Sequence, residues 1–238
     1  MLKVELHAHT ADDPQDWIPH STTELIDHAA HAGYAALAIT LHDRQLDVRW
    51  LADYASERGI VLIPGIERTI EDKHVLLLNF SRGTEDVRTF EDLARLKARA
   101  SGLIVAPHPF FPSRTSLLGR LDALANLFDA VERNAMYTAS LDFNVRAERW
   151  AARRDKPVVG TGDVHRLWQL GTTYSVVDAE PHADAICAAI AAGRVRVESR
   201  ALTWTEATQT MASLLLGLSH APKPARSTTR ESDPEPAR

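Results

Sequence analysis

The chain has 238 residues, 45% of them hydrophobic and 25% charged, which is ordinary for one soluble globular domain of barrel size. The net charge of -5 argues against a dedicated nucleic-acid coat, and the only cysteine, Cys187, excludes an internal disulfide and a thiolate metal cluster. Its Ala-Ile-Cys-Ala-Ala-Ile context predicts a buried helical position. No leader pattern or membrane-length apolar run is present, so we expect a cytoplasmic protein without a membrane partner.

Strand-like and helix-like stretches alternate along the chain. Short runs rich in Val, Ile and Leu predict strands at Leu2–Leu6, Ala35–Thr40, Ile60–Pro64, His74–Phe80, Leu103–Ala106, Ala130–Glu132, Pro157–Gly160 and Thr173–Val177. Between them, helices are predicted at Thr22–Ala32, Leu46–Arg58, Asp86–Ser101, Ser116–Leu127, Ala139–Arg154 and Ala183–Ala192. This order predicts an α/β fold with a parallel, right-handed winding.

The two ends of the first predicted helix carry clear boundary signals. Ser21 and Glu24 have the spacing of a capping box, and Gly33 is a typical stop. Near the end of the chain, Glu206–Ser219 predicts a last helix. The following segment contains four prolines and no large apolar residue, which predicts disorder. We therefore expect a single domain over residues 1–219 and a disordered tail over residues 220–238.

Imidazole and carboxyl groups recur where the predicted strands end. His7 and His9 lie at positions i and i+2 of the first strand and therefore share a face, although such a pair alone is a weak signal. The same placement recurs at His42, Glu67, His108, Asp163 and His165. Barrel active sites are built at strand ends, and a nitrogen and oxygen ligand set without sulfur favours Zn, Mn or Fe.

The ordered set of motifs resembles the polymerase and histidinol phosphatase (PHP) superfamily. The segments that carry the resemblance are His7-Ala8-His9-Thr10, Ile39-Thr40-Leu41-His42-Asp43, Gly65-Ile66-Glu67, the following His74, Pro107-His108-Pro109 and Gly162-Asp163-Val164-His165. The resemblance implies a distorted (β/α)₇ TIM-like barrel, two or three divalent metal ions and phosphoester hydrolysis. It implies the ligands His7, His9, His42, Glu67, His74, His108, Asp163 and His165. By itself, His74 at the start of an apolar run would be read as a structural histidine.

Two positions depart from the family pattern. Leu41 stands where the family often has Asp, so a hydrogen bond to His42 could be missing and Asp43 could partly replace it. The family also often has a Ser-Asp-Gly turn after the first motif, where this chain reads Ala11-Asp12-Asp13-Pro14. We expect Asp13 to be the ninth ligand, with Asp12 as its rival; an acidic turn without a metal role is the alternative.

Several further residues are candidates for contact with substrate. Arg68 and Arg166 follow site motifs and could neutralise phosphate oxygens, the alternative being solvated loop arginines. His20 and Asp43 are candidates for protonating the leaving group. Glu132-Arg133-Asn134 resembles an acid-x-Asn element of the family. Phe110, Phe111 and Trp17 could wall the pocket, the alternative being core or lid packing.

The predicted activity is hydrolysis of a small phosphate ester by a metal-activated hydroxide. Two alternatives stay open: a C–N hydrolase of the amidohydrolase type, which also begins with His-x-His, and a metal-bearing PHP module without activity. Against the first, that family typically has a bridging lysine where this chain has Glu67. Phosphomonoesters, nucleotides and short oligonucleotides are all candidate substrates. The oligomeric state cannot be predicted from the sequence.

Overall fold

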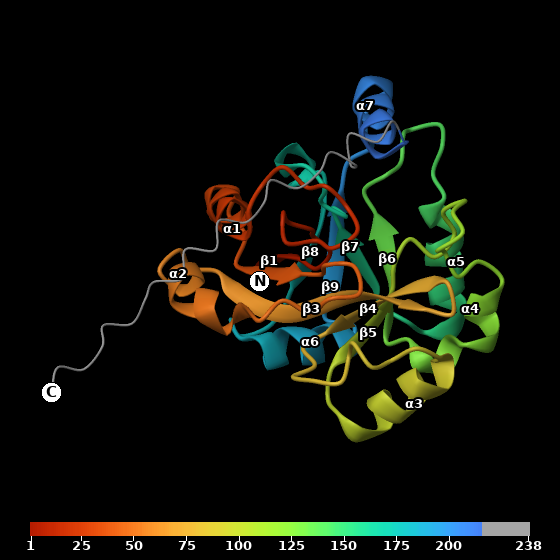
Figure 1. Ribbon diagram of the computed structural model, residues 1–238. Coiled ribbons are helices and arrows are strands. Elements are labelled where there is room, and N and C mark those ends of the chain that lie inside the picture. Colours follow the sequence, from red (N-terminus) through yellow and green to blue (C-terminus); the bar gives the residue numbers. More distant parts are fainter. Residues whose placement is uncertain (216–238) are drawn as a thin grey trace, which may run out of the picture.

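One mixed β-sheet curves into a nearly closed barrel in the computed structural model, which describes residues 1–215 (Figure 1). The strand order is β7-β6-β5-β4-β3-β2-β1-β8-β9. The strands are β1 (Leu2–Glu5), β2 (Ala36–Ile39), β3 (Val61–Ile70), β4 (Lys73–Leu78), β5 (Leu103–Ala106), β6 (Ala130–Asn134), β7 (Val158–Thr161), β8 (Thr173–Val177) and β9 (Val195–Ser199). The fold is the α/β, distorted TIM-like barrel that the motifs predict.

The winding is not uniformly parallel, which corrects the sequence prediction. Strands β1, β2 and β3 are parallel neighbours, as are β5, β6 and β7, but β4 runs antiparallel to both β3 and β5. A two-residue hairpin turn joins β3 to β4, with positive φ at Glu71 (47°) and Asp72 (63°). Such turns usually carry Asn-Gly or Asp-Gly, so Glu-Asp gives no strong turn signal. Strand β3 consequently runs on to Ile70, and Glu67 lies within the strand rather than after its end.

Strands β8 and β9 complete the barrel wall beside β1. Strand β8 pairs antiparallel with β1, and β9, which the sequence did not predict, pairs antiparallel with β8. The gap to β7 is bridged by the hydroxyl of Ser175, which lies 3.0 Å from both the amide N and the carbonyl O of Gly160. A Cβ at Gly160 would lie 2.6 Å from Val197 Cγ1, so only glycine permits this approach.

The helices differ from the predictions mainly in length. They are α1 (Thr22–His31), α2 (Ala52–Ser56), α3 (Phe90–Arg99), α4 (Arg120–Ala123), α5 (Asn144–Arg154), α6 (Ala183–Ala191) and α7 (Trp204–Leu215). The capping box of Ser21 and Glu24 is confirmed at α1. The helix predicted over Ser116–Leu127 is wrong for most of its length: only α4 and a 3₁₀ turn at Ala125–Leu127 form there. The end of the last predicted helix and the predicted tail lie outside the described residues.

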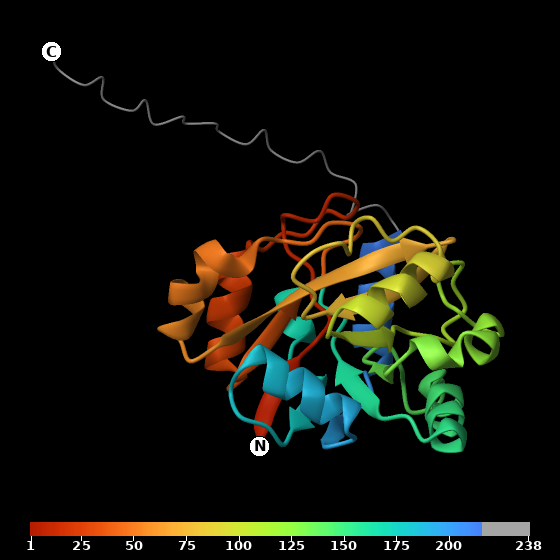
Figure 2. The ribbon, with the colours of Figure 1, turned by 90° about the horizontal axis from the view of Figure 1, so that it is seen from below.

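The barrel interior is apolar and is closed at one end by α6. Val4, Ile63 and Val105 from the strands pack in one buried cluster with Ile186 and Ile190 of α6. Cys187 lies in the same cluster, as its sequence context predicts. In Figure 2, α6 and the N-terminus lie at the bottom of the molecule, and the loop after β1 lies at the top. Within residues 1–215, no helix has the length and apolar character needed to span a membrane.

Candidate metal centre

The first and last sequence motifs lie side by side at the open end of the barrel. The amide N of Val164 donates to the carbonyl of His7 over 3.1 Å, and the amide N of His9 donates to the carbonyl of Val164 over 2.9 Å. On the other side, the amide N of Thr40 donates to the carbonyl of Ala8 over 2.9 Å. Backbone hydrogen bonds therefore fix the motifs around His7, His42 and Asp163 relative to one another.

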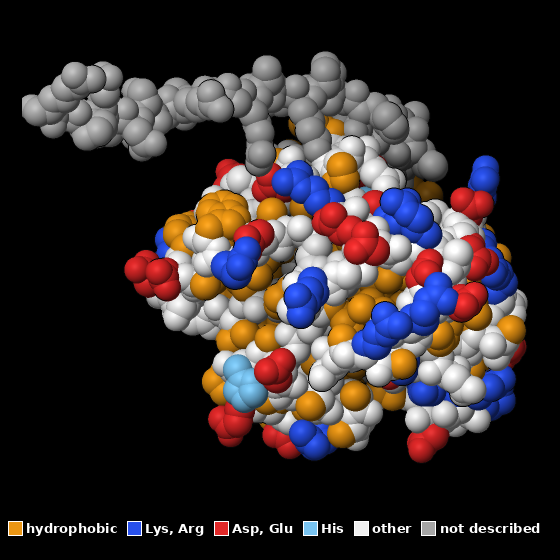
Figure 3. Space-filling model, turned by 60° about the horizontal axis from the view of Figure 1, so that its bottom comes forward, with side chains coloured by type: hydrophobic (Ala, Val, Ile, Leu, Met, Phe, Trp, Pro, Cys, Tyr) orange, Lys and Arg blue, Asp and Glu red, His pale blue; other side chains and the backbone are white. Residues whose placement is uncertain are grey.

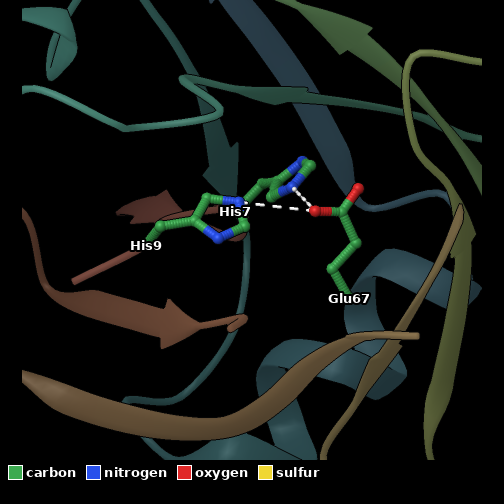
Figure 4. Close-up of side chains that lie close together, drawn as sticks. All are labelled: His7, His9 and Glu67. Carbon is green, nitrogen blue, oxygen red and sulfur yellow. Dashed lines mark ion pairs between the residues drawn. The ribbon is translucent and has the colours of Figure 1, made fainter. Parts of the chain in front are cut away.

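Glu67 lies at the centre of the cluster (Figure 4). Its Oε2 atom is 3.2 Å from Nε2 of His7, 3.4 Å from Nε2 of His9 and 3.2 Å from Nε2 of His42. Its Oε1 atom is 2.6 Å from Nδ1 of His74 and 3.1 Å from Nε2 of His108. A single buried carboxylate therefore faces five imidazoles with its two oxygens, which is the placement of a bridging ligand.

His74 reaches this centre because β4 runs opposite to its neighbours. The C-terminal ends of β3 and β5 lie at the open end of the barrel, so the N-terminal end of β4 lies there too. His74 is the second residue of β4 and pairs with Thr69 of β3. This explains why His74 precedes its apolar run, whereas His42 and His108 follow theirs.

Four ligand atoms have the spacing of a divalent ion site. Nε2 of His7 and Nε2 of His9 lie 3.4 and 3.6 Å from Oδ1 of Asp163, in addition to their 3.2 and 3.4 Å separations from Oε2 of Glu67. Zinc bonds of about 2.1 Å at tetrahedral angles put ligand atoms about 3.4 Å apart. These four distances fit a divalent cation held between the two histidines and the two carboxylates.

Unpartnered nitrogen atoms support the same conclusion. Among the described residues, Nε2 of His7, Nε2 of His9 and Nδ1 of His74 are buried without a hydrogen-bond partner. Buried polar atoms almost always find a partner, and an ion is one explanation for those that do not. Each of the three lies within 3.4 Å of a Glu67 oxygen, so a cation held there would satisfy them all.

The surrounding charges keep the central acids ionised. Burial alone would raise the pKa of Glu67, but His74, His7 and His42 hold it well below its usual value. Asp163 shows the same balance, because His7 and His9 outweigh its burial and lower its pKa. Both carboxylates therefore carry the charge that a metal ligand needs.

Strained backbone occurs at two of the site residues. His108 and Asp163 both have positive φ, 28° and 47°, in a region that non-glycine residues seldom adopt. Such conformations persist where surrounding structure fixes them, and they cluster at functional sites. At His108 the amide N donates to Glu132, and at Asp163 the carboxylate accepts from Asn134 Nδ2 over 3.1 Å.

Asp13 and Asp16 approach the far side of the cluster, and the sequence analysis missed Asp16. Oδ2 of Asp13 lies 3.0 Å from Nδ1 of both His9 and His42, and it accepts from the amide N of His42 over 2.9 Å. Oδ2 of Asp16 lies 3.2 Å from Nε2 of His165 and 3.9 Å from Nδ1 of His42. Since three aspartates follow His9 within seven residues, the spacing alone could not identify which of them face the histidines.

The structure also shows what compensates for Leu41. Leu41 is fully buried with Leu25 and Ile26 of α1, so its side chain points into the core. The hydrogen bond to His42 comes from Asp13 instead. Asp43 is occupied elsewhere, since its carboxylate accepts from Arg68, from the amide N of Thr69 and from Gln15.

A second buried carboxylate, Glu132, orients the ligands. Its Oε1 accepts from Nδ1 of His7 over 2.8 Å and from the hydroxyl of Thr161, and its Oε2 accepts from the amide N of His108. Nδ1–H of His7 is thereby directed away from Glu67, which leaves Nε2 for a metal. The Glu5 side chain fixes the backbone of two motifs, because it accepts hydrogen bonds from the amides of His7 and Gly162. Burial raises the pKa of Glu5 to about 8.

The residues predicted to contact substrate lie around the cluster, where they form hydrogen bonds to other groups of the protein. Arg68 donates to Asp43 and to the carbonyl of Val87, and Arg166 donates to the carbonyl of His165 and lies over the ring of Trp17. His20 donates from Nε2 to the carbonyl of His9, and burial lowers its pKa to about 4. The nine predicted metal ligands are brought together; the roles of Arg68, Arg166, His20 and Asp43 stay predictions.

Comparison with known proteins agrees with this geometry. A family model described as PHP-associated matches residues 142–195. A solved two-domain protein from Bacteroides vulgatus, whose name includes a predicted PHP-like metal-dependent phosphoesterase, aligns with a TM-score of 0.67 and 20% identity. The alignment covers 87% of this chain and 68% of that one. This chain shares the fold of that PHP-like protein.

Two other solved structures share the PHP fold at lower similarity. Endonuclease Q, in complex with a 27-mer duplex that has an abasic lesion at the active site, aligns with a TM-score of 0.56 and 15% identity over 88% of this chain and 67% of that one. An amidohydrolase from Chromobacterium violaceum with bound sulfate aligns with a TM-score of 0.54 and 16% identity over 68% and 87%. A search of curated proteins gives no match. At these identities the likeness concerns the fold.

Proposed function

We propose that this chain is a member of the PHP superfamily and a metal-dependent hydrolase of a small phosphate ester. The observation that carries the proposal is the arrangement of His7, His9, Glu67 and Asp163: Nε2 of each histidine lies 3.2 to 3.6 Å from Oε2 of Glu67 and from Oδ1 of Asp163. Phosphoester hydrolysis in two of the similar proteins, one predicted from its name and one a nuclease acting on duplex DNA, supports the same reaction class.

The ligand set divides into groups that could each hold a cation. His7, His9, Glu67 and Asp163 form the first group, and Glu67, His74 and His108 form the second. A third could form from His42 and His165 with Asp13 or Asp16. We propose Zn, Mn or Fe in these positions, because imidazole nitrogens and carboxylate oxygens suit all three.

Bound divalent cations would supply the Lewis-acid charge that lowers the pKa of a water and neutralises phosphate oxygens. The chain's own contribution is to hold that charge in a fixed place. The buried Glu67 and Glu132 and the partly exposed Asp163 would repel a phosphate if no cation balanced their charges. The imidazoles of the cluster would hold the cations in fixed places, so the reacting groups would need little rearrangement.

Protonation of the leaving group has no assigned residue in the cavity beside the centre. His20 and Asp43, the predicted acids, do not line that cavity in the described part of the chain. We keep His20 and Asp43 as proposed acids, which would require the substrate to approach from the side of the loop after β1. Arg68 and Arg166 are kept as proposed phosphate-binding residues, and they require the same approach.

The C–N hydrolase alternative has one specific observation in its favour, since an amidohydrolase shares the fold. The bridging position speaks against it, because Glu67 rather than a lysine faces the imidazoles. The module without activity is disfavoured by the complete ligand set. We therefore propose a soluble, cytoplasmic enzyme. Its substrate would be a small phosphorylated compound, a nucleotide or a short oligonucleotide.

The test is turnover of a chromogenic phosphate ester by the full chain, with added manganese or zinc and with a chelator. His7→Ala and His108→Ala should lose metal content and turnover together, by at least a hundredfold in turnover. His31→Ala is the matched control, because this exposed α1 histidine bonds only to the carbonyl of Asp27 in the contacts described. Turnover that persists in a variant without metal would contradict the proposal.

A further inference from the structure

An open cavity of about 250 Å³ adjoins the metal centre. Glu67, His74, His108 and Asp163 are among the residues that line it. Its lining also includes three apolar side chains from separate segments: Phe111 after β5, Met136 after β6 and Met211 of α7. A substrate held at the metal centre by its phosphate would therefore place its organic group against these three side chains.

Helix α7 is fixed over this cavity by contacts outside it. The amide N of Leu202, just before α7, donates to the carbonyl of Tyr137 over 2.8 Å, and Thr138 forms a bridge with Leu202. Glu206 accepts from both Nη atoms of Arg200, at 3.1 and 2.8 Å, at the first turn of the helix. Figure 1 shows α7 beside the loop that follows β6. Met211 is thus held as part of the wall.

No lysine or arginine lines the cavity among the residues that the structure describes. Apart from the metal-centre residues, its polar members are Ser113, Thr115 and Asn134, which are all neutral. The hydroxyl of Ser113 is occupied with Thr115 at 3.0 Å and with Ser116 at 2.9 Å. Negative charge on the part of a substrate remote from the metal centre would have no partner here.

Resting on the proposed function, we propose that the cavity accepts an uncharged, apolar leaving group, aryl or short alkyl, of a small phosphomonoester, and that Met136 and Met211 determine this preference. Methionine is flexible and polarisable, and it packs well against aromatic rings. Drug-sized ligands occupy pockets of roughly 300–1,000 Å³, so this cavity matches a smaller compound.

Nucleic acid is disfavoured by the same observations. Binding along a phosphate backbone depends on Lys and Arg contacts, and none lines this cavity within residues 1–215. On the face that Figure 3 shows, Lys and Arg side chains are interspersed with Asp and Glu, so this face offers no continuous basic surface. An oligonucleotide is therefore the competing outcome of the test.

The test compares binding of phenylphosphonate and methylphosphonate, which cannot be hydrolysed, to the metal-loaded full chain by calorimetry. We expect phenylphosphonate to bind about 10-fold more tightly or better. Met136→Gln and Met211→Gln should each reduce this ratio at least about 3-fold while leaving methylphosphonate binding and metal content unchanged. Gln209→Ala, on the exposed side of α7, is the matched control and should keep the ratio.

Equal affinities in the parent protein, or a ratio that both methionine variants retain, would overturn the proposal, as would tighter binding of an abasic oligonucleotide. Measuring turnover of phenyl phosphate and of glycerol phosphate distinguishes a wrong pocket assignment from a wrong hydrolase assignment. Hydrolysis of both esters without preference would refute the pocket assignment alone. A phenyl preference in binding without turnover of any ester would refute the hydrolase assignment alone.

Discussion

Oε1 of Glu132 lies 2.8 Å from Nδ1 of His7, and both side chains are fully buried. Although burial would raise the pKa of Glu132, the neighbouring His7 lowers it, so the carboxylate stays ionised. Glu132 belongs to β6 and His7 follows β1, so this contact crosses the barrel. Glu132 is not a proposed metal ligand, but through this contact it orients His7, which is one.

Replacement of Glu132 by Gln should therefore weaken metal binding while the barrel stays folded. The amide cannot accept from His7 with an anionic oxygen, and its NH₂ group would face a donor. Loss of such a partner typically costs 10- to 100-fold in metal affinity, which a competition titration with a chelator would measure. Glu148→Gln on α5, whose partner is Arg133, is the control. An affinity within 3-fold of the parent protein would contradict this role.

The three aspartates after the first motif should differ in effect. Asp13 bonds two imidazoles, and His42 and His9 lower its pKa against the effect of burial, so Asp13→Asn should cause the largest loss of bound metal. Asp16→Asn should lower the stoichiometry by at most one ion, because Asp16 contacts His165 at the edge of the cluster. Asp12→Asn should retain the parent stoichiometry, since Asp12 accepts from Thr22. Elemental analysis checks this order, and loss of metal in Asp12→Asn would reverse it.

Metal removal should destabilise the folded chain. Any ion that binds only the native state adds stability, by about 2.7 kcal/mol at a free concentration 100 times its dissociation constant. A chelator should therefore lower the melting temperature by several degrees, and His31→Ala should respond as the parent protein does. His7→Ala should respond less, because Nε2 of His7 is one of the unpartnered atoms. A melting temperature that is insensitive to chelator would argue against a resident ion.

Gly160→Ala should destabilise the barrel at the junction of β7 with β8 and β9. The added Cβ would lie 2.7 Å from the carbonyl O of Tyr174 and 2.6 Å from Val197 Cγ1, and the backbone atom cannot move aside cheaply. We expect a loss of about 1–3 kcal/mol in the free energy of unfolding, measured by chemical denaturation. Gly119→Ala is the control, because a Cβ there has no neighbour within 4 Å. Equal stability of the two variants would show that the strands are not closely apposed here.

The attachment of α7 should weaken at acidic pH. The hydrogen bond from Arg200 lowers the pKa of Glu206 from its usual value of about 4.5 to about 2. A depressed carboxyl pKa adds stability that is present above about pH 4.5 and is lost as the pH falls toward 2. Because the pair is largely solvated, we expect only about 0.5 kcal/mol. The measurement is the amide hydrogen-exchange rate in α7 of the parent protein, divided by the rate in Glu206→Gln at the same pH. This ratio should rise as the pH falls from 5 to 3, because the variant has no carboxyl group to protonate at this position.

The sequence predicted the clustering of the proposed ligand side chains better than it predicted the sheet. Strands β5 and β8 were predicted with their observed bounds, and all nine proposed ligands meet at one end of the barrel. Strand-end placement works because the C-terminal ends of parallel strands share one edge. The reversal at β4 escaped prediction because Glu71-Asp72 adopts a left-handed turn without glycine or asparagine.

Other features depend on contacts that no local pattern encodes. Strand β9 has a polar sequence, Val-Arg-Val-Glu-Ser, and is recognisable only by its pairing with β8. Asp16 faces His165 across 149 positions of sequence, so its role depends on the closure of the barrel. The place of Met211 in the cavity wall likewise follows from how α7 packs.

The backbone contact between Ala8 and Val164 has a consequence for how the protein matures. During synthesis, the ribosome releases the first histidine pair long before Asp163 and His165 exist. An ion that arrives at a nascent chain would find an incomplete set of ligands. Tight loading of the proposed centre would therefore wait until translation has passed residue 165, and metal occupancy would separate chains that extend beyond this residue from shorter ones.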